Sequence, residues 1–284
     1  MNKLIILGTC QDGGYPQSGC IASCCVDVQN NTRLISSIAV INKNNNQCWI
    51  FDASPDIKYQ LNMLRKHMGA SDFPIISGIF LTHAHIGHYL GLLSIGLEVM
   101  NLQNVPVYAM PEMAHFIENN APFSQLVEKK NIVIKMINED SLVHLDSNCS
   151  VSPFSVPHRN EFSETVGYSI KTNKSSTIFI PDIDSWKLWD IDLLNFITKH
   201  NLLFLDGTFY EKSELKLRDI SKVPHPSIVE SIDLFSDLDE DDKKKIYFTH
   251  FNHTNMVLNP SSDERLYVQN SGFNIAQEGQ EFDI

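Results

Sequence analysis

Three histidines lie within six residues of this 284-residue chain. The stretch reads His83-Ala84-His85-Ile86-Gly87-His88, and histidines at alternate positions of an extended turn direct two imidazole rings at one ion. Imidazole nitrogen is a common ligand of zinc and of iron. An ion with an open coordination position lowers the pKa of bound water toward about 7 and so supplies hydroxide at neutral pH. The stretch therefore predicts a catalytic metal centre that includes His83, His85 and His88.

Further histidines and aspartates directly follow apolar runs elsewhere in the chain. They are His158, Asp182, Asp206 and His250, and His253 lies just beyond the last of them. Apolar runs of this length predict buried strands, and α/β proteins place their sites at strand ends. We expect Asp182 to orient water or act as general base. We expect His250 or His253 to stabilise an oxyanion or to protonate a leaving group.

The elements that must position these residues alternate between strands and helices. Strands are predicted at Leu4–Leu7, Ser37–Ile41, Cys48–Phe51, Ile75–Thr82, Val105–Ala109, Asn131–Ile137, Val151–Val156, Val166–Lys171, Thr177–Ile180, Leu202–Leu205 and Ile246–Thr249. Helices are predicted at Pro55–Met68, Tyr89–Met100, Leu188–His200 and Ser227–Phe235. No Pro/Gly/Ser-rich linker divides the chain. We therefore expect one α/β domain over residues 1–284, in which two sheets pack together with helices outside.

Composition excludes several classes of function. The net charge of −12 is repelled by the phosphates of nucleic acid and by anionic membranes. No apolar run approaches the roughly 20 residues of a membrane span, and the N-terminus lacks the pattern of a signal peptide. We expect a cytoplasmic enzyme with a small-molecule substrate. The oligomeric state stays open, with a homodimer as the commonest form.

The residues from Thr82 to His88, followed by His158, Asp182 and a late histidine, resemble the signature of the metallo-β-lactamase superfamily. The branch that contains pyrroloquinoline quinone biosynthesis protein B is similar at GTCQDGGYPQ (8–17), PDID (181–184), DGTF (206–209) and HFNHTN (250–255). The resemblance spans nearly the whole chain. It implies an αββα sandwich with metals at one edge of the two sheets.

The resemblance also implies a set of ligands. His83, His85 and His158 would hold a first ion, Asp182 would lie between two ions, and His88 and His250 would belong to a second. One or two zinc ions are expected, with iron and manganese as alternatives. The usual motif has an aspartate where this chain has Gly87, and glycine has no side-chain donor. The second site is therefore weakened, changed in metal preference or absent, and His253 is the candidate replacement ligand.

Three of the six cysteines, Cys20, Cys24 and Cys25, also lie within six residues. In a reducing compartment such a cluster indicates a metal site or free thiols. Related members, including phosphodiesterases of phosphonate metabolism, carry a structural zinc on three cysteines and a distant histidine. The resemblance implies these three cysteines and His225 as that site. The family spacing places a cysteine where this chain has Ala22, so a loop of reduced thiols is the alternative.

The leading prediction is a metal-dependent hydrolase that acts on an ester, phosphodiester, lactone or similar electrophile. The second is an iron-dependent oxidation related to quinone cofactor biosynthesis, because a histidine-rich centre with few carboxylates also suits Fe(II). The third is a non-catalytic metal-binding protein, since a fold does not guarantee activity.

Overall fold

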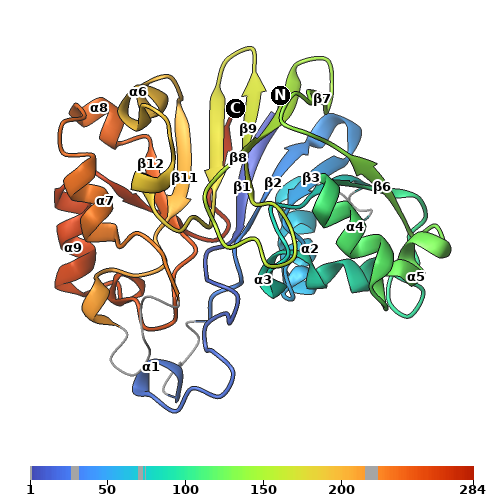
Figure 1. Cartoon of the computed structure of the whole chain (residues 1–284), viewed down its shortest axis with the longest axis horizontal. Coiled ribbons are helices and arrows are strands. Elements are labelled where there is room, and N and C mark those ends of the chain that lie inside the picture. Colours follow the sequence, from blue (N-terminus) through green and yellow to red (C-terminus); the bar gives the residue numbers. More distant parts are fainter. Residues whose placement is uncertain (1, 27–31, 70–72, 74, 215–222) are drawn as a thin grey trace.

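Two seven-stranded sheets pack face to face, and helices cover their outer faces (Figure 1). This computed structural model describes residues 2–26, 32–69, 73, 75–214 and 223–284. Helices α2 to α5 lie against the first sheet, and α6, α7 and α9 lie against the second (Figure 1). The layers therefore form the expected αββα sandwich.

The first sheet has the strand order β14-β1-β2-β3-β4-β5-β6. The strands β14, β1, β2 and β3 are antiparallel neighbours, and β3 to β6 are parallel. Their bounds are Asn2–Gly8 (β1), Ser37–Asn42 (β2), Gln47–Phe51 (β3), Ile75–Phe80 (β4), Val105–Ala109 (β5), Ile132–Met136 (β6) and Glu281–Asp283 (β14). The C-terminal strand β14 thus forms one edge of the first sheet, beside the N-terminal strand β1.

The second sheet has the strand order β13-β12-β11-β10-β9-β8-β7. The strands β10 to β13 are parallel, and β7 to β10 are antiparallel neighbours. Their bounds are Val143–His144 (β7), Cys149–Ser155 (β8), Val166–Thr172 (β9), Ser176–Ile180 (β10), Leu202–Asp206 (β11), Ile246–Thr249 (β12) and Asn274–Ile275 (β13). Each sheet therefore has a parallel part, and the predicted ligands His83, Asp182 and His250 follow strands of these parts.

Short helices connect the strands. The α-helices are Ser23–Val26 (α1), Ile57–Met68 (α2), Ile86–Tyr89 (α3), Pro111–Asn119 (α4), Phe123–Glu128 (α5), Leu193–Thr198 (α6), Ile228–Leu234 (α7), Glu240–Lys243 (α8) and Asp263–Asn270 (α9). The 3-10 helices are Lys43–Asn45 (η1), Leu90–Ile95 (η2), Trp186–Leu188 (η3), Lys212–Glu214 (η4) and Met256–Leu258 (η6).

Two predicted helices are shorter than expected. Over Tyr89–Met100 the chain forms η2 and then turns at Gly96, whose extended backbone ends the helix. Over Leu188–His200 the α-helix begins only at Leu193, since the Asp192 side chain accepts a hydrogen bond from a backbone amide and caps the helix there.

Aromatic side chains fill the space between the two sheets. Phe51 and Phe80 stack with ring centroids 4.9 Å apart, and Tyr168 from the second sheet meets both rings edge-on. The Tyr168 hydroxyl donates a hydrogen bond of 2.6 Å to the carbonyl oxygen of Leu81. Burial of each such ring stabilises the fold by roughly 1.5–3 kcal/mol. This layer holds the end of β4, and therefore the histidines that follow it, against the second sheet.

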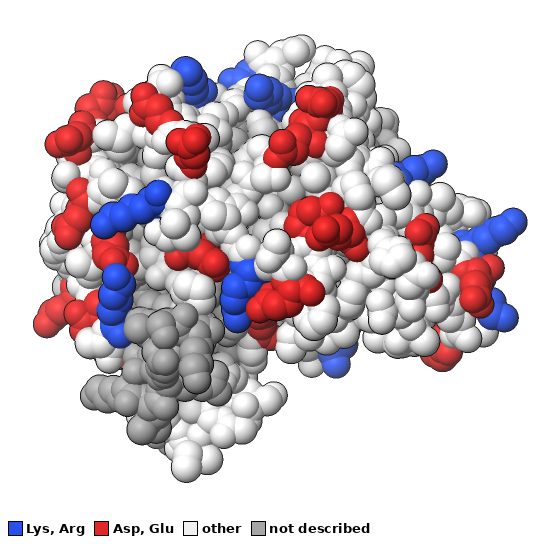
Figure 2. All heavy atoms as spheres, viewed as in Figure 1, with Lys and Arg blue, Asp and Glu red and all other residues white. Residues whose placement is uncertain are grey.

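The excess of acidic over basic residues in the sequence is visible on the surface. Figure 2 shows Asp and Glu side chains spread over one face, with Lys and Arg in small separate groups between them. The described residues on this face form no extended basic patch. Among the residues that the structure describes, no helix is long and apolar enough to cross a membrane.

Candidate metal centre

The predicted ligands meet at one edge of the sandwich. His83, His85 and His88 follow β4 of the first sheet, whereas the other groups follow or end strands of the second sheet: His158 after β8, Asp182 after β10, Asp206 at the end of β11 and His250 after β12. The centre therefore lies between the sheets, and both halves of the chain contribute side chains to it.

The first group contains His83, His85, His158 and Asp182, each with one ligand atom within 4.8 Å of the others. The Oδ2 atom of Asp182 lies 3.4 Å from His83 Nε2, 3.7 Å from His85 Nδ1 and 3.2 Å from His158 Nε2. The side chains of His83, His158 and Asp182 are buried, whereas that of His85 is 17% exposed. The group is thus enclosed on three sides and open on the fourth.

Several buried ligand atoms have no hydrogen-bond partner among the described residues. They are His83 Nε2, His88 Nε2, His250 Nε2 and Asp182 Oδ1. A buried polar atom without a partner costs roughly 1–3 kcal/mol, and four such atoms at the same edge of the sandwich suit bound cations, in one or both groups, that would satisfy them. The residues present therefore fit a metal centre.

In His83 and His158 the other ring nitrogen is held in place. His83 Nδ1 lies 3.0 Å from the hydroxyl of Thr82, and His158 Nδ1 lies 2.7 Å from a carboxylate oxygen of Asp184. Such outer contacts fix the ring orientation and leave Nε2 for an ion. Burial, followed by the charge of His88, lowers the pKa of His83 well below its usual range. The His83 ring is therefore neutral, as a ligand must be.

Carboxylate charge is concentrated at Asp182. Burial raises the pKa of Asp182, but the charges of His158, His225 and His250 outweigh burial and lower the pKa well below its usual range. Burial lowers the pKa of His158, and the neighbouring Asp182 and Asp184 reverse this and raise it to about 10, so an ion that binds this ring would displace its proton. Asp182 is therefore an anion at the middle of the centre.

The second group contains His88, His250 and, unexpectedly, Asp12. His88 Nδ1 lies 2.7 Å from a carboxylate oxygen of Asp52, and His250 Nδ1 lies 2.9 Å from the hydroxyl of Thr208. Asp52 and His250 both have positive φ, at 66° and 62°. A left-handed backbone in a residue other than glycine costs of order 1–3 kcal/mol and is retained mostly at functional sites. Both residues follow the ends of strands, where this turn directs their side chains into the centre.

Asp12 was not among the predicted site residues. It lies 3.5 Å through Oδ1 from His88 Nε2, and the same oxygen accepts a hydrogen bond of 3.0 Å from the backbone amide of Gly87. In the sequence, only its place in the segment 8–17 could have indicated a role for Asp12, because no strand ends directly before it and no histidine lies beside it.

His225 lies elsewhere than expected. We expected it beside the cysteines, but its Nδ1 lies 2.8 Å from Asp206 Oδ2 and 3.2 Å from Asp182 Oδ1. Asp182, Asp206, His225 and His250 form a third, fully buried group. Burial lowers the pKa of His225, and the carboxylates of Asp206 and Asp182 reverse this and raise it. The expected pairing of His225 with the cysteines is therefore wrong.

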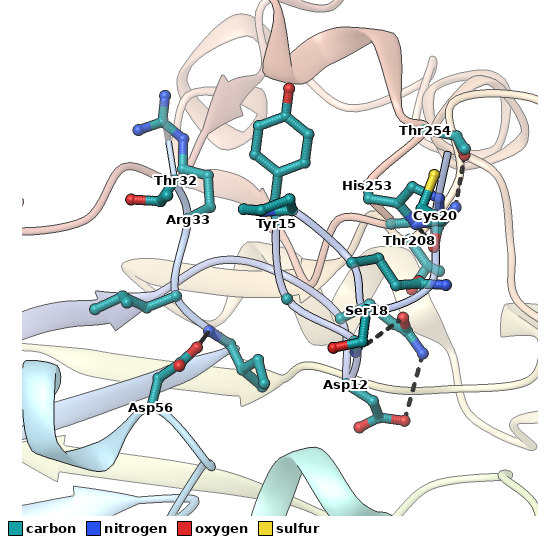
Figure 3. A pocket seen from close by; sticks show the side chains of 18 of the residues that line it. Asp12, Tyr15, Ser18, Cys20, Thr32, Arg33, Asp56, Thr208, His253 and Thr254 are labelled. Carbon is teal, nitrogen blue, oxygen red and sulfur yellow. Dashed lines mark hydrogen bonds between the residues drawn. The ribbon is translucent and has the colours of Figure 1, made fainter. Parts of the chain in front are cut away.

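His253 takes the place that we expected for His225. Cys20, Cys24, Cys25 and His253 each have one ligand atom within 4.8 Å of the others, and Figure 3 shows Cys20 beside His253. The sulfur atoms of Cys24 and Cys25 lie 3.9 Å apart. His253 is therefore not placed to replace the missing ligand at position 87. The resemblance had implied His225, yet His253 lies three residues after His250 and is carried to the cysteine loop by the same turn.

A cavity of about 1480 Å³ lies beside the centre. Its wall includes Asp12, Ile86, Thr208, Phe209 and His253, and Figure 3 shows Asp12 on the loop that also carries Tyr15 and Cys20. A small molecule in this cavity would therefore contact both the second group and the loop that bears the cysteines.

A model of the beta-lactamase superfamily domain matches residues 49–251 of the chain. The chain belongs to the beta-lactamase superfamily. Coenzyme PQQ synthesis protein B from Methylorubrum extorquens is 25% identical, and that from Bradyrhizobium diazoefficiens 26%, each over 99% of both chains. The fold and family that the sequence predicted are therefore confirmed.

Two solved structures have the same fold. The crystal structure of Zn²⁺-bound PqqB from Methylobacterium extorquens has a TM-score of 0.83, with 24% identity over 99% of this chain and 100% of that chain. A diphosphatase of the PhnP family has a TM-score of 0.69, with 20% identity over 99% of this chain and 96% of that chain.

Proposed function

We propose that this superfamily member is a zinc-dependent hydrolase acting on an ester or phosphodiester-type small molecule in the cavity. The observation that supports this most is the convergence of His83, His85, His158 and Asp182, whose ligand atoms lie within 4.8 Å of one another. His88 and His250 lie against this group and offer ligand atoms to a second ion.

The chain's own residues supply the remaining chemistry. An ion bound here would polarise a substrate oxygen and lower the pKa of water. Asp182 stays ionised at neutral pH, so it would orient the attacking water. His225, whose ring is held by Asp206 at 2.8 Å, carries the proton that the leaving oxygen needs. This role replaces the one that we expected for His250 and His253, because His250 offers its free Nε2 to the second group and His253 lies beside the cysteines.

Replacement of one ligand tests the proposal. His85→Ala should remove at least one zinc ion from the first group and lower kcat/KM by at least about 10³-fold on 4-nitrophenyl acetate or bis(4-nitrophenyl) phosphate, since the ion activates the nucleophile. His144→Ala, an exposed histidine on β7, is the matched control and should behave as the wild type. Full zinc content and full turnover in His85→Ala would end the proposal.

The second candidate is an iron-dependent oxidation in quinone cofactor synthesis. It is supported by the near full-length similarity to coenzyme PQQ synthesis protein B and by the group of two imidazoles and one carboxylate at His88, His250 and Asp12. That ligand set with open positions is typical of Fe(II) sites that use oxygen. Oxygen uptake that depends on Fe(II), without hydrolysis of either probe, would favour this function over hydrolysis.

A further inference from the structure

The position of Gly87 raises the question of what supplies a carboxylate to the second group. A Cβ atom built on Gly87 would lie 2.2 Å from Oδ1 of Asp12 and 2.9 Å from its Cα. Real Cβ atoms do not approach so closely, so no side chain fits at position 87 while Asp12 holds its place. The Asp12 carboxylate thus occupies the space into which a residue at position 87 would project.

His88 and His250 each present a ring nitrogen that could bind an ion of this group. His88 and His250 each have Nδ1 held, by Asp52 and by Thr208, and each has a buried Nε2 atom without a hydrogen-bond partner among the described residues. His88 Nε2 lies 3.5 Å from Asp12 Oδ1. This separation is longer than a good hydrogen bond, and two ligand atoms of one ion commonly lie this far apart.

The loop that carries Asp12 is fixed to the strand end that carries His250. The backbone amide of Gln11 donates a hydrogen bond of 2.9 Å to the carbonyl oxygen of Phe251, and the amide of Phe251 donates one of 2.8 Å to Thr9. The Gln11 side chain lies 3.4 Å through Nε2 from Asp12 Oδ2 (Figure 3). Asp12 is therefore positioned as firmly as a residue on a strand.

We propose that Asp12 is the carboxylate ligand of the second metal ion, supplied from the N-terminal loop in place of the aspartate that Gly87 replaces. Two imidazoles and one carboxylate leave coordination positions open to the cavity, which Asp12 lines. The centre then holds two ions although the motif lacks its aspartate. This assignment deepens the proposed function and rests on the same metal centre.

Zinc content of the purified protein tests the assignment. After dialysis against buffers of fixed free Zn²⁺, Asp12→Asn should hold about one ion fewer per chain than the wild type and bind that ion at least about tenfold more weakly, because a direct ligand is lost. Asp56→Asn is the matched control, since Asp56 lines the same cavity, accepts a hydrogen bond from the Ile35 amide and belongs to no ligand group. Its zinc content should equal that of the wild type.

A second set of variants separates a ligand from a merely structural residue. Asp12→Gly should lose the ion, and Asp12→Glu should regain it in part, because a carboxylate is again within reach of His88 and His250. The set also decides the question if Asp12→Asn does not fold. Unchanged zinc content and affinity in Asp12→Asn, or a folded Asp12→Glu variant that binds zinc no better than Asp12→Gly, would overturn the assignment.

The failure of this assignment differs from the failure of the proposed function. If the Asp12 variants lose and regain the ion but the wild type hydrolyses no probe, the ligand assignment stands and hydrolysis falls. If the wild type hydrolyses a probe and Asp12→Asn keeps every ion, hydrolysis stands and the ligand assignment falls.

Discussion

At the residue scale, four of the metal-facing histidines are each paired with a second group that fixes the ring. The partners are hydroxyls for His83 and His250 and carboxylates for His88 and His158. A carboxylate partner makes an imidazole more basic and a stronger ligand, whereas a hydroxyl chiefly orients it. One histidine with a carboxylate partner therefore lies in each group: His158 in the first and His88 in the second.

Asp184 allows this pairing to be tested without removal of a ligand. Its carboxylate lies 2.7 Å from His158 Nδ1, and its side chain is 19% exposed. We expect Asp184→Asn to weaken zinc binding at the first group about 10- to 100-fold while the chain stays folded. Titration with a competing chromophoric chelator measures this, and Asp190→Asn, an exposed aspartate nearby in sequence, is the control. An affinity equal to that of the wild type would show that Asp184 does not act on the ligand.

At the element scale, the N-terminal loop joins two candidate metal groups. Asp12 lies at its start, and Cys20, Cys24 and Cys25 lie at its end and in α1, against His253. Because His253 follows His250 by three residues, an ion on the cysteines would tie the loop to the turn that carries a ligand of the centre. We propose that this group holds a structural zinc that keeps the loop over the cavity.

Cys20→Ser tests the structural zinc. We expect this variant to lose about one zinc ion per chain, since serine is a poor zinc ligand, and to be cleaved faster within the loop by proteinase K. Ser18→Ala, on the same loop and lining the same cavity, should keep both its zinc and its resistance. If Cys20→Ser keeps its full zinc content, the cysteines are reduced thiols without an ion.

The same elements explain how much could be predicted from sequence. Residues that directly follow apolar strands, such as His158, Asp182 and His250, could be placed because a strand end fixes both position and direction. Asp12 and His225 could not, since each lies on an irregular segment whose course depends on distant contacts. Gly87 indicated only that a ligand was missing. The candidate replacement is Asp12, which the fold of the N-terminal loop brings against Gly87.

At the scale of the whole molecule, the centre depends on the packing of one sheet against the other. The first sheet supplies His83, His85 and His88 through β4, and the second supplies the remaining histidines and Asp182. The aromatic layer between them includes Phe51, Phe80 and Tyr168, all fully buried. A centre divided in this way forms only after the two sheets have docked, so folding and metal binding are linked.

Anomalous diffraction at the zinc edge from crystals of the zinc-loaded protein tests most directly whether the distant residues share an ion. A peak within about 2.0–2.2 Å of nitrogen atoms of His83, His85 and His158 and of an Asp182 oxygen is the expected result. A second peak is expected at the same distances from His88, His250 and Asp12. If His83, His85 and His158 surround no peak in fully loaded crystals, the chain has no catalytic metal centre and the account is wrong.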